Sequence, residues 1–231
     1  MVHAVLFDID DTLVDFSGAT EEGLRAYLAA IEPSFDEVAE ALSVWRRLER
    51  EHYARYLTGE LTFAGQRRAR VQAFREIVGA FGDDDADVWM AGYLRHCEAA
   101  FRLFADVLPA LRDLAALGYR LGALSNSSRA YQEYKLTMLD VRDRFETLVC
   151  CDDVGGRAKP DPAMFQLACR RMALAPADVV YVGDDLDKDA RAATSAGLTG
   201  VWLDRRGDHP HDVPRIHALD ELEPMLAGWT G

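Results

Sequence analysis

The chain has 231 residues, of which 49% are hydrophobic and 28% charged, and its formal net charge is -13. This balance is typical of a folded globular protein and excludes a disordered chain. The acidic excess disfavours binding to a nucleic-acid polymer or to an anionic membrane surface, because both select a positively charged protein surface.

The sequence carries no signal for a membrane or an oxidising compartment. No segment reaches the roughly 20 consecutive apolar residues that cross a bilayer, and the first residues lack the basic segment of a secretory leader. The four cysteines, at positions 97, 150, 151 and 169, have neither metal-ligand spacing nor the pattern of a disulfide framework. We therefore expect a cytoplasmic protein with buried, reduced thiols.

The first part of the chain changes from a strand pattern to helical patterns. Residues 2–9 are mostly apolar and partly β-branched, which predicts a buried strand. Residues 16–103 then place apolar side chains at helical spacing in four successive segments, with a turn at residues 82–85 before the fourth. This part of the sequence is predicted to be all-helical.

From residue 104 onward, strand and helix patterns alternate. Strands are expected at residues 119–124, 148–151, 179–182 and 200–203, and helices at residues 109–117, 128–139, 161–173 and 188–196. Such alternation predicts an α/β fold with a parallel sheet and covering helices. We therefore expect a core domain of residues 1–15 and 104–231, with residues 16–103 inserted as a helical cap domain.

Acidic side chains follow two of the expected strands. They are Asp8, Asp10 and Asp11 after the first strand, and Asp184, Asp185, Asp187 and Asp189 after the strand at 179–182. Ligands of a parallel sheet bind at the carboxyl ends of its strands, and clustered carboxylates repel one another unless a cation or a proton lies between them. Oxygen ligands of this kind suit Mg²⁺. The alternative is a solvated turn or a helix N-terminus, where Asp and Thr are common.

Two further polar features precede helices. Ser125 and Asn126 follow the strand at 119–124, where a hydroxyl and backbone N–H groups can hold phosphate oxygens, although both residue types are also ordinary helix caps. Lys159 is one of only three lysines, and it stands directly before Pro160. An exposed Lys-Pro turn is the alternative interpretation of that position.

Taken together, the motifs D-x-D-x-T (8–12), Ser125, Lys159-Pro160 and G-D-x-x-x-x-D (183–189) resemble those of the haloacid dehalogenase (HAD)-like hydrolase superfamily. The match extends over nearly the whole chain. It includes a helical block inserted after the first motif, as in subfamily I of the phosphatase branch. The resemblance implies a Rossmann-like core sheet beneath a helical cap.

The resemblance also implies a role for each motif residue. Asp8 is expected to be the nucleophile that forms an aspartyl-phosphate, and Asp10 the acid that protonates the leaving oxygen and later activates water. Mg²⁺ is expected to be bound by Asp8, the backbone carbonyl of Asp10 and Asp184. Ser125, Lys159 and Asn126 are expected around the phosphoryl oxygens. Thr12 is expected to steady the loop of the first motif and is counted with the phosphate-binding residues. Asp185 and Asp189 are expected around the metal and its waters.

The implied function is a Mg²⁺-dependent phosphatase of a small phosphate monoester, such as a nucleotide, a sugar phosphate or a phosphoglycolate-like metabolite. We expect a monomer or a homodimer whose partner is a small phosphorylated metabolite, and neither a nucleic-acid polymer nor a membrane.

Other activities within the superfamily remain as alternatives. A 2-haloacid dehalogenase is disfavoured by Asp10, because a halide leaves without a proton. A phosphonatase relies on a cap lysine, and residues 16–103 contain none. A phosphomutase and a non-catalytic binding protein of the same fold stay open.

Overall fold

The computed structural model describes residues 2–79, 85–205, 207 and 210–229, so residues 82–84 of the expected turn lie outside the described part. The chain divides into two compact units. One unit combines Met1–Asp15 with Arg102–Gly231, and the other is Phe16–Phe101. Each unit is described by itself below.

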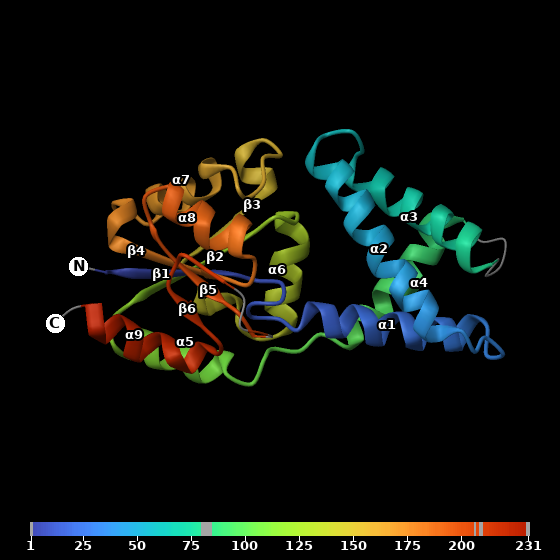
Figure 1. Ribbon diagram of the computed structural model, residues 1–231, viewed down its shortest axis with the longest axis horizontal. Coiled ribbons are helices and arrows are strands. Elements are labelled where there is room, and N and C mark those ends of the chain that lie inside the picture. Colours follow the sequence, from blue (N-terminus) through green and yellow to red (C-terminus); the bar gives the residue numbers. More distant parts are fainter. Residues whose placement is uncertain (1, 80–84, 206, 208–209, 230–231) are drawn as a thin grey trace. The chain divides into compact units, whose positions relative to one another are not determined.

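The first unit contains a parallel sheet of six strands in the order β3-β2-β1-β4-β5-β6 (Figure 1). The strands are β1 (Ala4–Asp8), β2 (Arg120–Ser125), β3 (Thr147–Cys150), β4 (Val179–Gly183), β5 (Thr199–Leu203) and β6 (Arg215–Ile216). This strand order is that of a Rossmann-type sheet. The predicted α/β class with a Rossmann-like parallel sheet is therefore confirmed.

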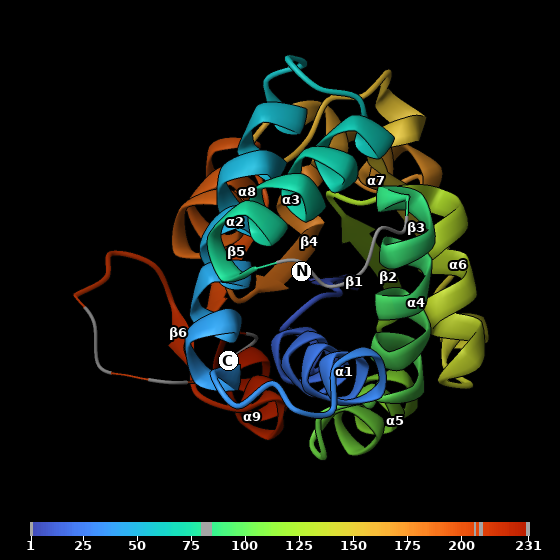
Figure 2. The ribbon, with the colours of Figure 1, turned by 90° about the vertical axis from the view of Figure 1, so that its right-hand side faces the viewer.

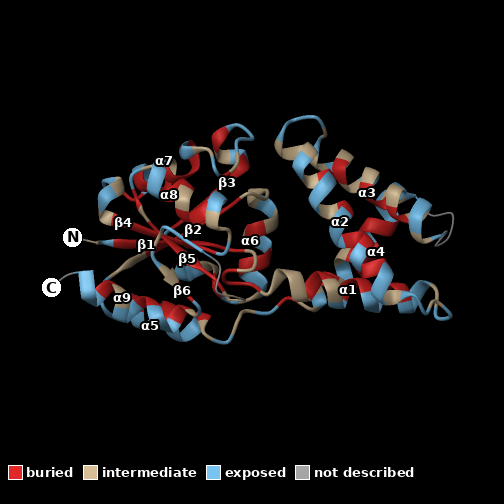
Figure 3. Cartoon of the chain, viewed as in Figure 1, coloured by how far each residue is buried: buried red, intermediate tan, exposed pale blue. Residues whose placement is uncertain are grey.

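Helices cover both faces of this sheet. They are α5 (Val107–Ala116), α6 (Arg129–Met138), α7 (Pro162–Arg171), α8 (Ala192–Ser195) and α9 (Leu222–Trp229). Successive strand residues point to opposite faces, so Val5 and Phe7 join an apolar cluster with α5, α6 and α9, whereas Ala4 and Leu6 join a second cluster with α7 and α8. The strands between these clusters are buried almost throughout (Figure 3).

The structure differs from the sequence prediction near the C-terminus. Strand β6 has only two residues, which is too short to produce an alternating pattern, and helix α9 contains Pro224 and Gly228, both weak helix formers. Neither element was expected. The helix expected at 188–196 is instead a π-helical segment, Leu186–Arg191, that continues into α8.

The second unit consists of four helices, with no strand among its described residues. They are α1 (Phe16–Ile31), α2 (Val38–Leu57), α3 (Phe63–Val78) and α4 (Ala86–Ala99), and α1 packs on α4 while α2 packs on α3 (Figure 2). The core of this unit is aromatic: the rings of Trp45 and Trp89 lie 5.1 Å apart, and Trp45 Nε1 donates a hydrogen bond to the Tyr93 hydroxyl at 3.0 Å.

All four cysteines are free and buried, as expected. Within the described ranges of the chain, no helix combines the length and the apolar character needed to cross a membrane.

Candidate active site

The parallel register brings the polar ends of three neighbouring strands to one edge of the sheet. Asp8 is the last residue of β1, which lies between β2 and β4. Asp8 pairs in register with Leu124, and the preceding Phe7 pairs with Val182. The residues that end β2 and follow β4, Ser125 and Asp184, are therefore carried to the same edge as Asp8.

Three carboxylates form a cluster at this edge. Asp8, Asp184 and Asp189 each offer an oxygen that lies within 4.8 Å of the other two. The close approach of Asp189 depends on Gly183, because a Cβ at position 183 would lie 2.4 Å from Asp189 Cγ. Only glycine leaves room for the Asp189 carboxylate there.

The loop after β4 fixes Asp189 through both of its oxygens. Oδ1 of Asp189 accepts a hydrogen bond from the Tyr181 hydroxyl at 3.0 Å, and Oδ2 accepts one from the backbone N–H of Asp185 at 3.1 Å. The carboxylate of Asp185 instead caps the π-helical segment, where it accepts from the backbone N–H groups of Asp187 and Lys188 at 3.0 and 2.8 Å. Asp185 thus supports Asp189 through its backbone rather than through its charge.

Lys159 lies against this acidic cluster. Its buried ammonium donates to Asp8 Oδ1 at 2.5 Å, to Asp189 Oδ1 at 2.6 Å and to the Tyr181 hydroxyl at 2.8 Å, which accounts for all three of its protons. Burial alone would lower the pKa of Lys159, but the charges of Asp189 and Asp8 outweigh burial and raise it. The ammonium therefore stays charged at neutral pH.

Asn126 holds the backbone of Lys159. Its side-chain oxygen accepts from the Lys159 N–H at 2.6 Å, and its Nδ2 donates to the Lys159 carbonyl at 2.9 Å. This paired contact ties the end of β2 to the loop that carries the lysine. Sequence analysis assigned Asn126 a role through its backbone N–H, whereas the structure shows what its side chain does.

The charges of the cluster are only partly compensated. Burial raises the pKa of Asp8 to about 7, against the opposing effect of Lys159 and with the help of repulsion from Asp189. Asp184 has solvent-exposed surface at the rim of the cluster, but the protein packed around its carboxylate removes hydration, and this effect together with repulsion from Asp8 and Asp189 raises its pKa. Carboxylates that repel one another at this spacing are a fitting donor set for a hard divalent cation.

Two contacts orient Asp184. The buried Thr12 hydroxyl lies 3.5 Å from Asp184 Oδ1, and Trp202 Nε1 donates to the Asp184 backbone carbonyl at 2.9 Å. In the structure, Thr12 thus supports an acidic residue of the cluster. Its expected part in phosphate binding stays a prediction.

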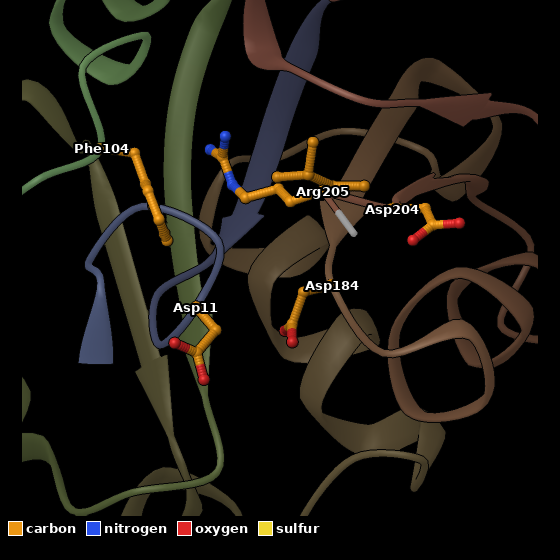
Figure 4. A pocket seen from close by; sticks show the side chains of 6 residues that line it. Asp11, Phe104, Asp184, Asp204 and Arg205 are labelled. Carbon is orange, nitrogen blue, oxygen red and sulfur yellow. The ribbon is translucent and has the colours of Figure 1, made fainter. Parts of the chain in front are cut away.

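An open pocket of about 310 Å³ adjoins Asp184 (Figure 4). It is lined by Asp11, Phe104, Asp184, Leu203, Asp204 and Arg205. The guanidinium of Arg205 stacks over the Phe104 ring at 4.0 Å and pairs with Asp106 at 2.8 Å, while also donating to the Thr12 carbonyl at 2.9 Å. The pocket therefore presents carboxylates beside one already paired arginine.

Asp10 is bound by two residues of α6 that sequence analysis did not assign to the site. Gln132 Nε2 donates to Asp10 Oδ2 at 2.8 Å and to Ser125 Oγ at 2.9 Å, and the ammonium of Lys135 pairs with Asp10 Oδ1. The scarcity of lysine was the available signal, since Lys135 is one of three in the chain.

The structure thus brings Asp8, Lys159, Asp184 and Asp189 into direct contact or close proximity, and links Asp10 to Ser125 through Gln132. The roles expected for these residues stay predictions.

Comparisons with known proteins agree with this arrangement. The model of the haloacid dehalogenase-like hydrolase family matches residues 2–197. A glyceraldehyde 3-phosphate phosphatase of Methanopyrus kandleri is 33% identical over 220 residues, which cover 93% of this chain and 89% of the relative.

Two solved structures share the fold over almost the whole chain. Bacillus subtilis YfnB, crystallised with bound magnesium, has a TM-score of 0.84 at 20% identity and covers 98% of this chain and 99% of its own. A 2-haloacid dehalogenase of Pseudomonas syringae pv. Tomato has a TM-score of 0.70 at 28% identity, with coverage of 99% and 100%. From the family match and the identity to the archaeal phosphatase, the chain belongs to the haloacid dehalogenase-like hydrolase family.

Proposed function

We propose that this chain is a Mg²⁺-dependent phosphatase that hydrolyses a small phosphate monoester through an aspartyl-phosphate on Asp8. The observation that carries the proposal is the buried contact between Lys159 and Asp8 at the edge of the three-carboxylate cluster. A carboxylate nucleophile beside a cation, next to a site for a second cation, suits attack on a negatively charged phosphoryl group. The similarity to a phosphatase over 93% of the chain supports the same conclusion.

The donor set for the metal is Asp8, Asp184 and the backbone carbonyl of Asp10, with Asp189 and the loop at Asp185 holding the arrangement in place. Asp189 suits a supporting role because both of its oxygens already accept hydrogen bonds. When bound, a divalent cation supplies positive charge that offsets repulsion between Asp8 and the phosphate.

In the first step, a carboxylate oxygen of Asp8 attacks phosphorus, and the bond from phosphorus to the ester oxygen breaks. The departing alkoxide takes the proton of Asp10 and leaves as an alcohol. Lys159 favours the ionised form of Asp8 and stabilises charge on the phosphoryl oxygens. Ser125, Asn126 and Thr12 are the proposed phosphate-binding residues of this step.

In the second step, water attacks the phosphorus of the aspartyl-phosphate. Asp10, now a carboxylate, takes the proton from that water, and the bond from phosphorus to the Asp8 oxygen breaks. Inorganic phosphate leaves, Asp8 is restored as a carboxylate, and Asp10 is protonated for the next cycle.

Asp10 also distinguishes this proposal from dehalogenation, which the Pseudomonas syringae neighbour performs according to its name. Displacement of a halide needs no proton donor, whereas an alkoxide does. A role for Asp10 at the leaving oxygen is supported by its link through Gln132 to Ser125, the last residue of β2.

We further propose that residues 16–103 form a cap domain that selects the substrate, and that the protein acts in the cytoplasm as a monomer or homodimer. The cap assignment is supported by the compact helical unit Phe16–Phe101, which the chain forms between β1 and β2.

The proposed function is tested with p-nitrophenyl phosphate and a panel of phosphorylated metabolites, with Mg²⁺ or with EDTA. We expect turnover that EDTA abolishes and that Asp8→Asn reduces at least about a thousandfold, since removal of a nucleophile leaves only residual catalysis. Chloride release from 2-chloropropionate is the parallel assay, and none is expected. Full activity in Asp8→Asn, or chloride release without phosphatase activity, would contradict the proposal.

A further inference from the structure

We propose that Lys135 and Gln132 are positioning residues that clamp the two carboxylate oxygens of Asp10 from helix α6. The inference rests on the proposed function, because it concerns the residue that acts there as acid and base. Neither Lys135 nor Gln132 belongs to the four sequence motifs, so the inference assigns a role in the reaction to two further residues.

The first observation is the burial of Lys135. Its side chain is 0% exposed, and a buried ammonium is costly unless an anion compensates it. Its carboxylate partner in the structure is Asp10, and the ammonium also lies 5.0 Å from the centre of the Tyr131 ring. The buried ammonium is thus paired with a carboxylate and does not face solvent.

The second observation is the double contact of Gln132. This residue lies one turn before Lys135 on α6, so both side chains project from the same face of the helix. Its fully buried amide donates to Asp10 Oδ2 at 2.8 Å and to Ser125 Oγ at 2.9 Å. One helix face therefore holds both oxygens of Asp10 and links them to the end of β2.

The third observation explains why Asp10 needs such a clamp. Its side chain is 28% exposed and extends from the loop after β1, and the negative charge of Asp10 repels that of Asp8. An unclamped carboxylate would turn away from Asp8 or toward a cation in the three-carboxylate cluster. Contacts at both oxygens hold the carboxylate in one orientation.

The clamp has a kinetic consequence that separates the two steps of the reaction. The p-nitrophenolate group leaves readily without a proton, so formation of the aspartyl-phosphate from p-nitrophenyl phosphate needs little from Asp10. Hydrolysis of the aspartyl-phosphate still needs Asp10 to take a proton from water. A displaced Asp10 therefore slows the second step more than the first.

The test is stopped-flow release of p-nitrophenolate by the whole protein with Mg²⁺, using Lys135→Met and Gln132→Met. Each variant removes the donor and keeps an unbranched side chain of similar size. We expect a burst approaching one equivalent per enzyme, followed by steady-state turnover reduced about tenfold to a hundredfold relative to the wild type. Gln132→Met keeps the test decisive if Lys135→Met does not fold.

Leu136→Ala is the matched control. Leu136 is a fully buried residue of α6 that packs in the apolar core. We expect this variant to lower the melting temperature while leaving the shape of the burst unchanged. If the two clamp variants retain wild-type kinetics within threefold, or if they change only as Leu136→Ala does, the inference is overturned.

A crystal structure separates this inference from the proposed function. If the wild type proves inactive on every phosphate, the proposed function fails. The position of the Asp10 side chain in the crystal structure then still tests whether Lys135 and Gln132 hold it. Contact of Asp10 with both α6 residues in the wild type, and its displacement in Lys135→Met, supports the clamp. An Asp10 side chain that occupies the same position in both proteins contradicts it.

Discussion

The ammonium nitrogen of Lys159 lies 2.5 Å from Oδ1 of Asp8, and both side chains are buried at the carboxyl edge of the sheet. Removing one member of a buried ion pair leaves an uncompensated charge. Lys159→Met is therefore expected to lower the free energy of unfolding in EDTA by about 3–5 kcal/mol at neutral pH, as measured by urea denaturation. Because the pKa of Lys159 is raised, its contribution persists at neutral pH and is lost only as pH rises through the raised value.

Lys188→Met is the control for that prediction. Lys188 pairs with Asp185 at 2.8 Å, but its side chain is 51% exposed, and exposed pairs contribute about 0–1 kcal/mol. Equal losses of stability in Lys159→Met and Lys188→Met would contradict the claim that the buried Lys159 pair contributes more to stability than an exposed pair.

The acidic cluster predicts a dependence of stability on pH and metal. The pKa of Asp184 is raised by burial and by the neighbouring carboxylates, so its ionisation disfavours the folded state. That penalty is absent below the ordinary pKa and grows as pH rises toward the raised value. In EDTA at pH 8, Asp184→Asn is expected to melt about 2–4 °C above the wild type, which corresponds to about 1 kcal/mol after discounting for solvent screening.

With added Mg²⁺, the wild type is expected to melt at a higher temperature than Asp184→Asn, the reverse of their order in EDTA. The wild type gains stability from a cation that binds the folded state, about 2.7 kcal/mol at a hundredfold excess over Kd, whereas Asp184→Asn gains much less. Asp220→Asn, at an exposed position in the turn before α9, serves as the control. A melting temperature that Mg²⁺ raises equally in all three proteins would argue against the metal site.

Gly183 provides a steric test of the same cluster. A Cβ at this position would meet the Asp189 carboxylate at 2.4 Å, so Gly183→Ala must displace Asp189 from Lys159. We expect a loss of about 1–3 kcal/mol in stability and about tenfold to a hundredfold weaker Mg²⁺ binding, measured by calorimetry. Gly228→Ala has open space around its new methyl group and lies in helix α9, where alanine is the better helix former. It is expected to leave Mg²⁺ binding unchanged and not to lower stability.

Asn126 tests how the lysine is held. Asn126→Ala removes two hydrogen bonds to the Lys159 backbone, each contributing about 1 kcal/mol, and is expected to lower the free energy of unfolding by about 2 kcal/mol. Asn126→Asp keeps the acceptor for the Lys159 N–H and loses the donor, so it is expected to lie between the alanine variant and the wild type. Identical unfolding curves for Asn126→Ala and the wild type would show that the paired contact is not formed in solution.

Sequence patterns predicted the sheet well because its strands are buried on both faces and read as short apolar runs. They also predicted that Asp8, Ser125 and Asp184 share an edge, since the carboxyl ends of parallel strands meet there. The π-helical segment was not predictable from helical spacing. Its wider turn alters which residues face inward, and it separates the buried Asp189 from the capping Asp185.

The contribution of α6 was not predictable for a different reason. Helical spacing places Gln132 and Lys135 on one face, but polar residues at that spacing ordinarily face solvent. Only the tertiary packing of α6 near the loop after β1 turns them toward Asp10. The same holds for Gly183, whose role depends on a side chain six residues later.

Identification of the phosphorylated residue tests the central claim most directly. The enzyme is mixed with ³²P-labelled substrate and Mg²⁺, quenched in acid within milliseconds, digested and sequenced by mass spectrometry. The account predicts an acid-stable, base-labile phosphate on the peptide that contains Asp8, and none in Asp8→Asn. Phosphate on another residue, or rapid turnover with no labelled peptide in either protein, would contradict it.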